Sequence, residues 1–113
     1  MEIYLANSLV ERLCQDQRYR TTRLGPVAAR KLEQRLMQMA AASSLAALST
    51  IPGLDPHPLM ADRQGEIAVT VHRGVRITFV PHGDPLPRLE GGALDLRSVT
   101  AICITEIGDY HRG

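Results

Sequence analysis

The sequence predicts an α+β domain, because segments with the period of a strand and segments with the period of a helix follow each other along one short chain. Residues 66–80 contain two alternating runs around a glycine-containing turn, which is typical of a β-hairpin. Residues 26–47 repeat apolar side chains at three- and four-residue steps, as an amphipathic helix does. Residues 100–107 are apolar on both faces, which indicates a central strand.

The chain of 113 residues is expected to form a single domain over residues 1–113. A chain of this size can bury roughly 65% of its unfolded surface, enough to fold without disulfides or metal. Cys14 and Cys103 are far apart and match no metal-binding spacing, so we expect reduced core thiols in a cytoplasmic protein, with no metal and no other cofactor. No segment resembles an export signal or approaches the ~20 apolar residues of a membrane span.

The formal net charge of +1 alone argues against a strongly nucleic-acid-binding surface. The charges are unevenly distributed, however, because residues 1–48 contain seven basic and four acidic side chains and the remainder contains six and eight. Twelve of the thirteen basic residues are arginine, which binds phosphates and carboxylates through a planar fork. This bias suits either RNA phosphates or an acidic partner, and a GC-rich genome would also produce it without any function.

The first predicted elements are a short strand at residues 2–6 and a helix that begins at Ser8. Ser8 and Glu11 have the spacing of a capping box, and the inward-facing side chains are expected to be Leu9, Val10, Leu13 and Cys14. The polar stretch from residue 15 to residue 23 is expected to be a solvated connection. Contact with a nucleic-acid backbone through the arginines of this stretch is the alternative.

A second helix is predicted to open at Gly25-Pro26, because proline is suited to the first helical position. Its apolar stripe, through about residue 47, is expected to pack on the sheet and to consist of Ala28, Leu32, Leu36, Met39, Ala40 and Ser43. Met37 and Met39 are expected to fill gaps in the core.

Two irregular connections flank the predicted hairpin. In residues 49–64, prolines exclude regular structure and hold His57 between Pro56 and Pro58. Residues 82–98 form a long connection in which residues 94–99 are expected to make a single helical turn. Loops held this rigidly are often functional.

The hairpin allows two turns. A two-residue loop, Arg73-Gly74, would set Val71 beside Arg76 and mix apolar with polar positions, which disfavours it. A three-residue loop that also includes His72 keeps one face wholly apolar. Its predicted pairs are Val71 with Val75, Val69 with Ile77 and Ile67 with Phe79.

In this register Arg76 projects from the middle of the face that points away from the core. Its neighbours on that face are mostly small or polar: Glu66, Ala68, Thr70, Thr78 and Val80. A solvated arginine on an open sheet face is one interpretation, and a binding residue is the other.

A series of short segments between about residue 8 and the end of the chain shares its order and spacing with one protein family. The segments are His57-x-Leu59, Asp62-Arg63-x-Gly65, Val75-Arg76-Ile77-x-Phe79, Asp84-Pro-x-Pro87, Gly91-Gly92, Val99-Thr100-Ala101-Ile102 and Asp109-Tyr110-His111. Together they resemble the RelE/ParE toxin superfamily in its HigB-like (plasmid killer protein) branch. The resemblance implies two N-terminal helices packed on one face of a small, curved, mainly antiparallel sheet, whose other face receives messenger RNA in the ribosomal A site.

The resemblance also implies a function, that of a toxin of a type II toxin–antitoxin pair that cleaves messenger RNA on the ribosome without a metal. The implied partners are the ribosome, messenger RNA and a cognate antitoxin, expected to be a helix-turn-helix protein; no membrane is implicated. The expected catalytic residues are His57, Arg76, Tyr110 and His111, and the expected RNA- or phosphate-binding residues are Arg63, Arg73 and Asp109. Such chemistry needs a base, positive charge on the phosphate oxygens and an acid.

Each assignment has a structural alternative. His57 can hydrogen-bond loop backbone, Arg63 can pair with Asp62 or Glu66, and Tyr110 can close the core with His111 solvated. The chain also departs from the family: Met60 replaces a common lysine, Val75 replaces an aromatic residue, and residues 96–98 replace a common tryptophan. Arg73 is placed to compensate for Met60. The remaining alternatives are a ParE-like gyrase inhibitor, an RNA- or ribosome-binding module that does not cleave, and a degenerate toxin that only binds its antitoxin.

Overall fold

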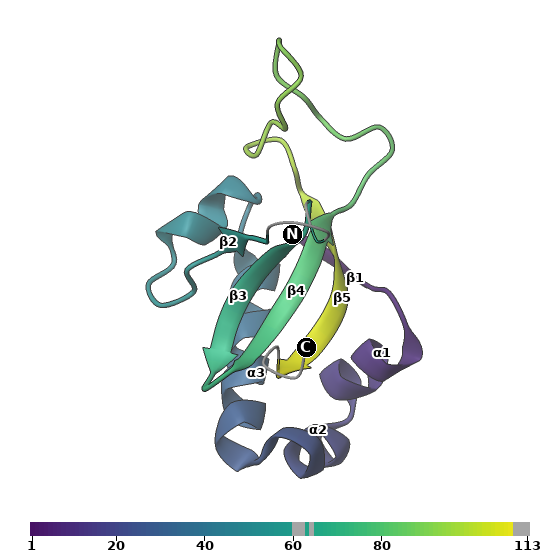
Figure 1. The fold of residues 1–113 in the computed structure, drawn as a ribbon, viewed down its shortest axis with the longest axis vertical. Coiled ribbons are helices and arrows are strands. Elements are labelled where there is room, and N and C mark those ends of the chain that lie inside the picture. Colours follow the sequence, from purple (N-terminus) through teal and green to yellow (C-terminus); the bar gives the residue numbers. More distant parts are fainter. Residues whose placement is uncertain (60–62, 64, 110–113) are drawn as a thin grey trace.

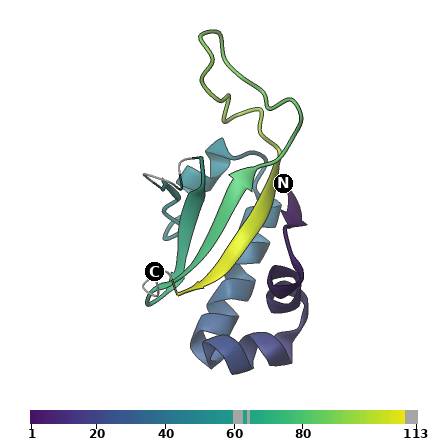
Figure 2. The same cartoon turned by 45° about the vertical axis from the view of Figure 1, so that its right-hand side comes forward.

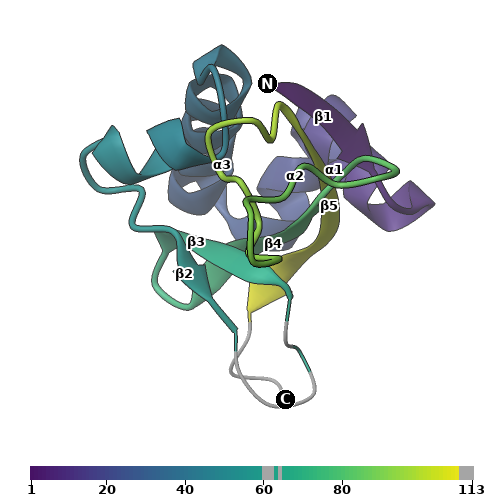
Figure 3. The ribbon, with the colours of Figure 1, turned by 90° about the horizontal axis from the view of Figure 1, so that it is seen from above.

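The computed structural model describes residues 1–59, 63 and 65–109, with the side chain of Asp109 excepted. The elements are β1 (Glu2–Leu5), α1 (Ser8–Gln15), α2 (Gln17–Leu24), α3 (Pro26–Ala41), the 3₁₀ helix η1 (Ala46–Thr50), β2 (His57–Pro58), β3 (Ile67–His72), β4 (Val75–Pro81) and β5 (Ala101–Asp109). In the described residues the strands form one five-stranded sheet in the order β1-β5-β4-β3-β2. The α-helices cover one face of this sheet (Figure 1, Figure 2 and Figure 3).

This arrangement confirms the predicted α+β fold, in which helices pack on one face of a mainly antiparallel sheet. β5 lies between β1, which runs parallel to it, and β4, which runs antiparallel to it. β4 pairs antiparallel with β3, and β3 pairs antiparallel with β2. The predictions of a first strand at residues 2–6 and of a central strand at residues 100–107 are therefore confirmed.

The hairpin turn is the two-residue loop Arg73-Gly74, so the three-residue loop predicted from the sequence is wrong. His72 pairs with Val75, and both loop residues have positive φ, 35° at Arg73 and 80° at Gly74. A type I′ turn requires this conformation, because its twist matches that of the flanking strands. Gly74 adopts it without the steric cost that arises for a residue with a Cβ.

A β-bulge reconciles this turn with the alternation of the sequence. The register shifts between Thr70 and His72, so Val71 is the extra residue of β3 and does not pair with Val75 as predicted. The other predicted pairs hold: Val69 with Ile77 and Ile67 with Phe79. Because one bulged residue restores the register, the predicted assignment of side chains to the two faces is confirmed beyond the turn.

α1 begins at the predicted residue, but Asn7 caps it. The backbone of Asn7 is extended, and its side-chain oxygen accepts a hydrogen bond from the Val10 amide at 2.9 Å. The capping box predicted at Ser8 is wrong, because Ser8 is already helical. Val10 is buried as predicted, whereas Leu9 is exposed.

The polar stretch predicted as a solvated connection forms a helix of its own, α2, so the described helical layer contains three α-helices. Asp16 separates α1 from α2 with an extended backbone, and its carboxylate accepts a hydrogen bond from the Tyr19 amide at 3.0 Å. One aspartate therefore ends one helix and caps the next.

Arg20 holds this junction together from inside. Its side chain is only 6% exposed, and its Nη1 donates to the carbonyls of Leu13 and Cys14 at 3.1 and 3.0 Å. Its Nη2 lies 3.5 Å from Glu33 on α3. A guanidinium suits the last carbonyls of a helix because they carry the negative end of the helix dipole. Arg20 therefore serves the helix junction and not a nucleic-acid backbone.

α3 opens at Pro26, as predicted, but ends at Ala41 and not near residue 47. Met39 is fully buried, which confirms its place in the core. Met37 is 67% exposed, so its predicted role in the core is wrong. The two methionines differ because residues two apart on a helix point to different sides.

The hydrophobic core lies between the helices and the inner face of the sheet. Phe79 is its largest fully buried side chain, and Leu32, Met39, Ile77, Ile102 and Ile104 are also fully buried. The inner-face positions of β4 and β5 thus supply much of the core.

Two long, mostly irregular segments connect the helices and strands. The first carries η1 and the two-residue strand β2, which adds to the edge of β3. The second follows β4 and projects beyond the end of the sheet (Figure 1 and Figure 2). It contains an isolated bridge between Arg88 and Leu94. Within residues 94–99, where a helical turn is predicted, there is a single hydrogen-bonded turn in which the Ser98 amide donates to the Asp95 carbonyl at 3.0 Å.

We expect Phe79→Ala to lower the free energy of unfolding by about 3–5 kcal/mol, because it empties the centre of the core. Urea denaturation followed by circular dichroism measures the change. Leu89→Ala, at an exposed residue of the projecting loop, is the control and should stay within about 0.5 kcal/mol of wild type. Equal stability of the two variants would contradict this core.

We expect Asn7→Ala to cost about 1 kcal/mol, because the Val10 amide loses its acceptor. Ser8→Ala should be near neutral, since Ser8 is not the cap. Asn7→Asp keeps the accepting oxygen and should retain most of the stability. The same denaturation assay decides; a larger loss at Ser8 than at Asn7 would restore the capping box predicted from the sequence.

Candidate functional site

The sheet face opposite the helices, here called the outer face, carries the residues that alternate away from the core. On β3 and β4 these include Ala68, Thr70, Arg76 and Thr78, and the pairs are Ala68 with Thr78 and Thr70 with Arg76. Figure 3 shows the helices on the other side of the sheet. The outer face is therefore the side on which polar groups can meet a ligand.

One row of paired residues crosses four strands of this face. His57 on β2 pairs with Ala68, Ala68 pairs with Thr78, and Thr78 pairs with Glu106 on β5. Three strand spacings separate the ends of the row, or about 14 Å between backbones. Ala68 and Thr78 in the middle are 0% exposed, so larger neighbouring side chains cover this small-residue floor.

His57 lies at one end of the row and is exposed. Its Nδ1 lies 3.1 Å from the carbonyl oxygen of Asp55. A carbonyl can only accept, so this contact assigns the proton of the neutral ring to Nδ1 and leaves Nε2 as an acceptor. The predicted alternative, a hydrogen bond to loop backbone, is thus present, and it also fixes the tautomer that a general base requires.

Arg63 joins two carboxylates across the sheet, and we call Arg63, Glu66 and Glu106 the Arg63 network. Its Nε and Nη2 donate to the two carboxylate oxygens of Glu66, both at 3.0 Å. Its Nη2 also donates to Glu106 at 2.9 Å. The predicted pairing of Arg63 with Glu66 is therefore present, and Glu106 adds a second partner.

Glu66 is held in its charged form. Hydrogen bonds from Arg63 lower the pKa of Glu66 most, while partial burial opposes the shift. The positive charges of Arg63 and Arg76 and a hydrogen bond from Thr105 lower the pKa of Glu66 further. Arg76 therefore belongs to the same electrostatic cluster as the Arg63 network. The carboxylates in turn raise the pKa of Arg63.

Arg76 lies on the outer face, as the sequence predicts, and is half-buried; it is the second residue of β4, close to the hairpin turn. Next to it along the strand, the fully buried Thr78 hydroxyl has no hydrogen-bond partner among the described residues. A buried hydroxyl without a partner costs about 1–3 kcal/mol. An unsatisfied buried group in a native structure has a specific cause, such as a bound water or a functional role.

The structure does not bring Arg73 into this cluster. Arg73 lies in the turn after β3, whereas Arg63 precedes the first residue of β3. A strand of six residues separates them by about 20 Å. The backbone of Asp109 pairs with Val75 beside the same turn. Arg73 and Asp109 thus mark one end of the outer face.

Tyr110 and His111, two of the four predicted catalytic residues, lie outside the described residues. Met60 and Asp62 also lie outside them. The candidate site described here therefore consists of His57, Arg63, Glu66, Arg76, Thr78 and Glu106.

Sequence reasoning did not assign Glu106 to the site. Glu106 lies in a strand that is largely apolar on both faces. A single carboxylate in such a strand is the sequence feature that could have identified it as a site residue. Its position also depends on a second bulge: Thr78 pairs with Glu106 and Phe79 with Ile104, which leaves Thr105 as the extra residue. The Thr105 hydroxyl donates to the carbonyl of Thr78 at 3.3 Å and fills the bulge.

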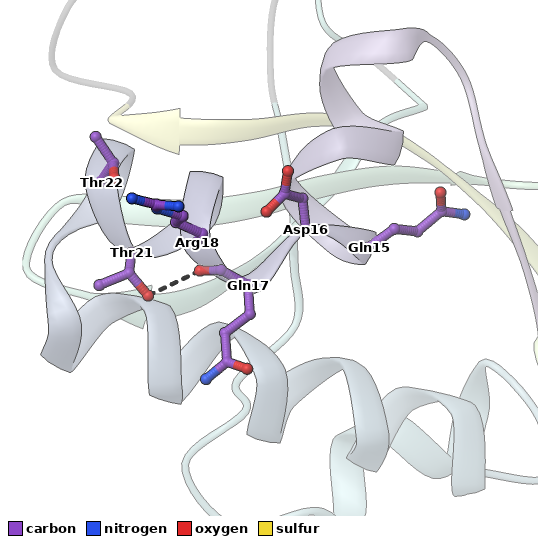
Figure 4. A pocket seen from close by; sticks show the side chains of 6 residues that line it. All are labelled: Gln15, Asp16, Gln17, Arg18, Thr21 and Thr22. Carbon is purple, nitrogen blue, oxygen red and sulfur yellow. Dashed lines mark hydrogen bonds between the residues drawn. The ribbon is translucent and has the colours of Figure 1, made fainter.

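The helical layer has a polar hollow of its own, at the junction of α1 and α2. Its lining residues are Gln15, Asp16, Gln17, Arg18, Thr21 and Thr22 (Figure 4). The Thr21 hydroxyl donates to the Gln17 carbonyl at 2.8 Å, and Asp16 caps α2. These groups are occupied with helix structure, so the hollow is a weaker candidate than the outer face.

No protein-family model matches this chain, and a comparison with the curated proteins found no match. Among the helices of the described residues, none is both long and apolar enough to cross a membrane. Within residues 1–59, 63 and 65–109, no three His, Cys, Asp or Glu side chains lie together so that they could hold a metal ion.

We expect the free energy of unfolding to fall at acidic pH, in part because Glu66 becomes protonated. Because its folded pKa is lowered, the carboxylate contributes stability that is fully present above its unfolded pKa, about 4.3, and that is lost as the pH falls through the folded value. Glu66→Gln should remove this contribution. Since the Arg63–Glu66 pair is partly solvated, the loss near neutral pH should be only about 0.5–1 kcal/mol.

Urea midpoints between about pH 3 and pH 7 measure this effect. Wild type should lose more stability on acidification than Glu66→Gln. Glu90→Gln, at an exposed residue of the projecting loop, should follow wild type. Parallel curves for wild type and Glu66→Gln would show that the Arg63 network contributes nothing to folding.

Proposed function

We propose that the protein is the toxin of a type II toxin–antitoxin pair and acts in the cytoplasm as a ribosome-dependent, metal-independent endonuclease of messenger RNA. One observation carries the proposal: ionisable groups from separate segments gather on the sheet face opposite the helices. They are His57 on β2, Arg63 and Glu66 before β3, Arg76 on β4 and Glu106 on β5. The RelE/ParE-like segments supply the same residues His57, Arg63 and Arg76.

The proposed reaction is an in-line attack of a ribose 2′-hydroxyl on the adjacent phosphorus. The hydroxyl proton passes to a base, the 2′-oxygen bonds to phosphorus, and the 5′-oxygen leaves and takes a proton from an acid. The products are a 2′,3′-cyclic phosphate and a 5′-hydroxyl. Negative charge builds on the non-bridging phosphate oxygens, and guanidinium groups stabilise it.

Arg76 is assigned to the phosphate, because it lies on the outer face next to the buried Thr78 floor. Arg63 would bind the same or the next phosphate after exchanging a carboxylate partner. His57 is the proposed base, since its tautomer leaves Nε2 as an acceptor. The resemblance implies proton transfer by His111, and with His57 as the base we propose His111 as the acid. It also implies base stacking or phosphate orientation by Tyr110 and contacts with RNA by Arg73 and Asp109.

The proposed partners are the ribosome with its messenger RNA and a cognate antitoxin of the helix-turn-helix class. The ribosome would position the substrate, so the isolated protein should cleave free RNA poorly.

A second candidate function is RNA or ribosome binding without cleavage. The Arg63 network favours it, because two carboxylates already neutralise Arg63, and Met60 adds no cation where many relatives carry lysine. Two further functions are distinguished by the growth and 5′-end experiments that follow: that of a degenerate toxin that only binds its antitoxin, and that of a ParE-like gyrase inhibitor.

We expect wild-type protein expressed without its partner to stop growth and to create new 5′ ends within translated messenger RNAs. Arg76→Ala should lower cleavage by about 10²–10³-fold and relieve toxicity, because one electrostatic contact to the transition state is lost. Arg76→Lys should also be impaired, since it keeps the charge but not the two-pronged fork. Mapping of 5′ ends and growth curves after induction measure both effects.

Arg30→Ala is the matched control, because Arg30 is an exposed arginine of α3 on the helical side. It should remain as toxic as wild type. Toxicity without new 5′ ends would favour binding or gyrase inhibition. Full toxicity of well-folded Arg76→Ala would remove the nuclease assignment from this face, and efficient cleavage of naked RNA would overturn the dependence on the ribosome.

A further inference from the structure

Two aromatic rings from distant parts of the chain stack on the outer face, away from the Arg63 network. The ring centroids of Tyr4 and His82 lie 4.1 Å apart with an interplanar angle of 29°. Tyr4 is 44% exposed and His82 is also exposed. The rings thus stack on each other while both remain accessible to solvent. By contrast, Phe79, Ile77, Ile102 and Ile104 of the same sheet are buried in the core.

The sheet register places this pair on the outer face. Tyr4 pairs with Cys103, and Cys103 pairs with Val80, which alternates outward along β4 with Arg76 and Thr78. His82 follows the end of β4, and its amide donates to the Ala101 carbonyl at 2.9 Å. β5 runs between the two rings, and beside them it presents the small residues Ala101 and Cys103 on the outer face. The rings can therefore meet across it.

The tyrosine ring is held in place by its hydroxyl. Tyr4 Oη donates to a carboxylate oxygen of Glu2 at 2.8 Å. This hydrogen bond and the negative charge of Glu2 raise the pKa of Tyr4. Glu2, the charged group in contact with the pair, is negative. It disfavours a phosphate at this place and leaves the ring face to an uncharged group.

We propose that the Tyr4–His82 pair is a stacking subsite for an unpaired nucleobase of single-stranded RNA. This inference rests on the proposed function, because it requires that the outer face binds RNA. Stacked aromatic side chains bind the faces of unpaired bases in many RNA-binding proteins, independently of sequence. The pair presents such a surface, and stacking on a ring face does not distinguish one base from another.

The position of the subsite fits a strand that also reaches the cations. From Arg76 to Val80 along β4 is four residues, or about 13 Å, and the ring pair lies beside the level of Val80. A short single-stranded segment can span this length. Its phosphate would lie at Arg76, and a flanking base would lie on the rings. The subsite therefore orients the strand and touches no reacting atom.

Binding of a fluorescein-labelled single-stranded RNA heptamer, followed by anisotropy at low salt, tests the subsite without requiring cleavage. Tyr4→Ala should weaken binding about tenfold or more, the loss found when one stacking residue is truncated. Tyr4→Phe keeps the ring and should bind nearly as wild type does. Tyr4→Leu keeps apolar bulk without a planar ring and should bind as weakly as Tyr4→Ala.

A heptamer with abasic sites separates the subsite from the phosphate contacts. It should bind wild type and Tyr4→Ala equally, whereas Arg76→Ala should weaken both oligonucleotides. If Tyr4→Ala or Tyr4→Leu binds the normal heptamer as wild type does, the subsite is wrong while the proposed function stands. If wild type binds neither oligonucleotide nor programmed ribosomes, the proposed function and the subsite both fall. Thermal unfolding must show that the variants are folded.

Discussion

The register of β4 against its two neighbours is the constraint on which the rest of the structure depends. Each pairing contains one bulge, at Val71 on β3 and at Thr105 on β5. Because the side-chain period of a strand is two, one extra residue moves everything beyond it to the other face. The first bulge accommodates the tight turn without exposing Val69, and the second places Glu106 outward while Ile104 and Ile107 stay buried. The two bulge residues, Val71 and Thr105, thus determine which side chains of β3 and β5 point into the core and which point to the outer face.

The Arg63 network occupies the place where the proposed function requires a phosphate. Ion pairs of partly exposed groups contribute only about 0–1 kcal/mol, so exchange of a carboxylate for a phosphate on Arg63 costs little. Two carboxylates on this face also repel the backbone of free RNA. In the proposed function, the network would keep the guanidinium oriented before RNA binds and would lower the affinity for any RNA that is not already positioned. For a substrate presented by the ribosome, the free-energy cost of binding would be smaller, because the orientation of the RNA is fixed in advance.

Much of the fold could be predicted from the sequence, because the period of apolar residues determines it. The hairpin faces and the central strand follow from such patterns, and the start of α3 follows from the proline at its first position. Turn geometry could not be predicted in this way: Arg73-Gly74 violates the alternation, and only the bulge at Val71 repairs it. The helix caps were also misplaced, since Asn7 and Ser8 are both good capping residues and differ by one position. Arg76 was found from strand parity, whereas the contact between Arg63 and Glu106 joins residues 43 positions apart and leaves no local signal.

The contacts of Glu66 and His57 indicate which of the two is better suited to act as the base in the proposed reaction. Glu66 is a weak base, because Arg63, Arg76 and Thr105 stabilise its charged form and lower its pKa. Its role is better explained as orientation of Arg63, through two hydrogen bonds that fix the plane of the guanidinium. The Asp55 carbonyl fixes the tautomer of His57 that can accept a proton, so His57 is the proposed base. In the proposed function, the described part of the outer face would thus provide a base, His57, and two cations, Arg63 and Arg76, of which Arg63 is oriented by the hydrogen bonds above. The proposed acid, His111, is the second residue after the end of β5 in the sequence.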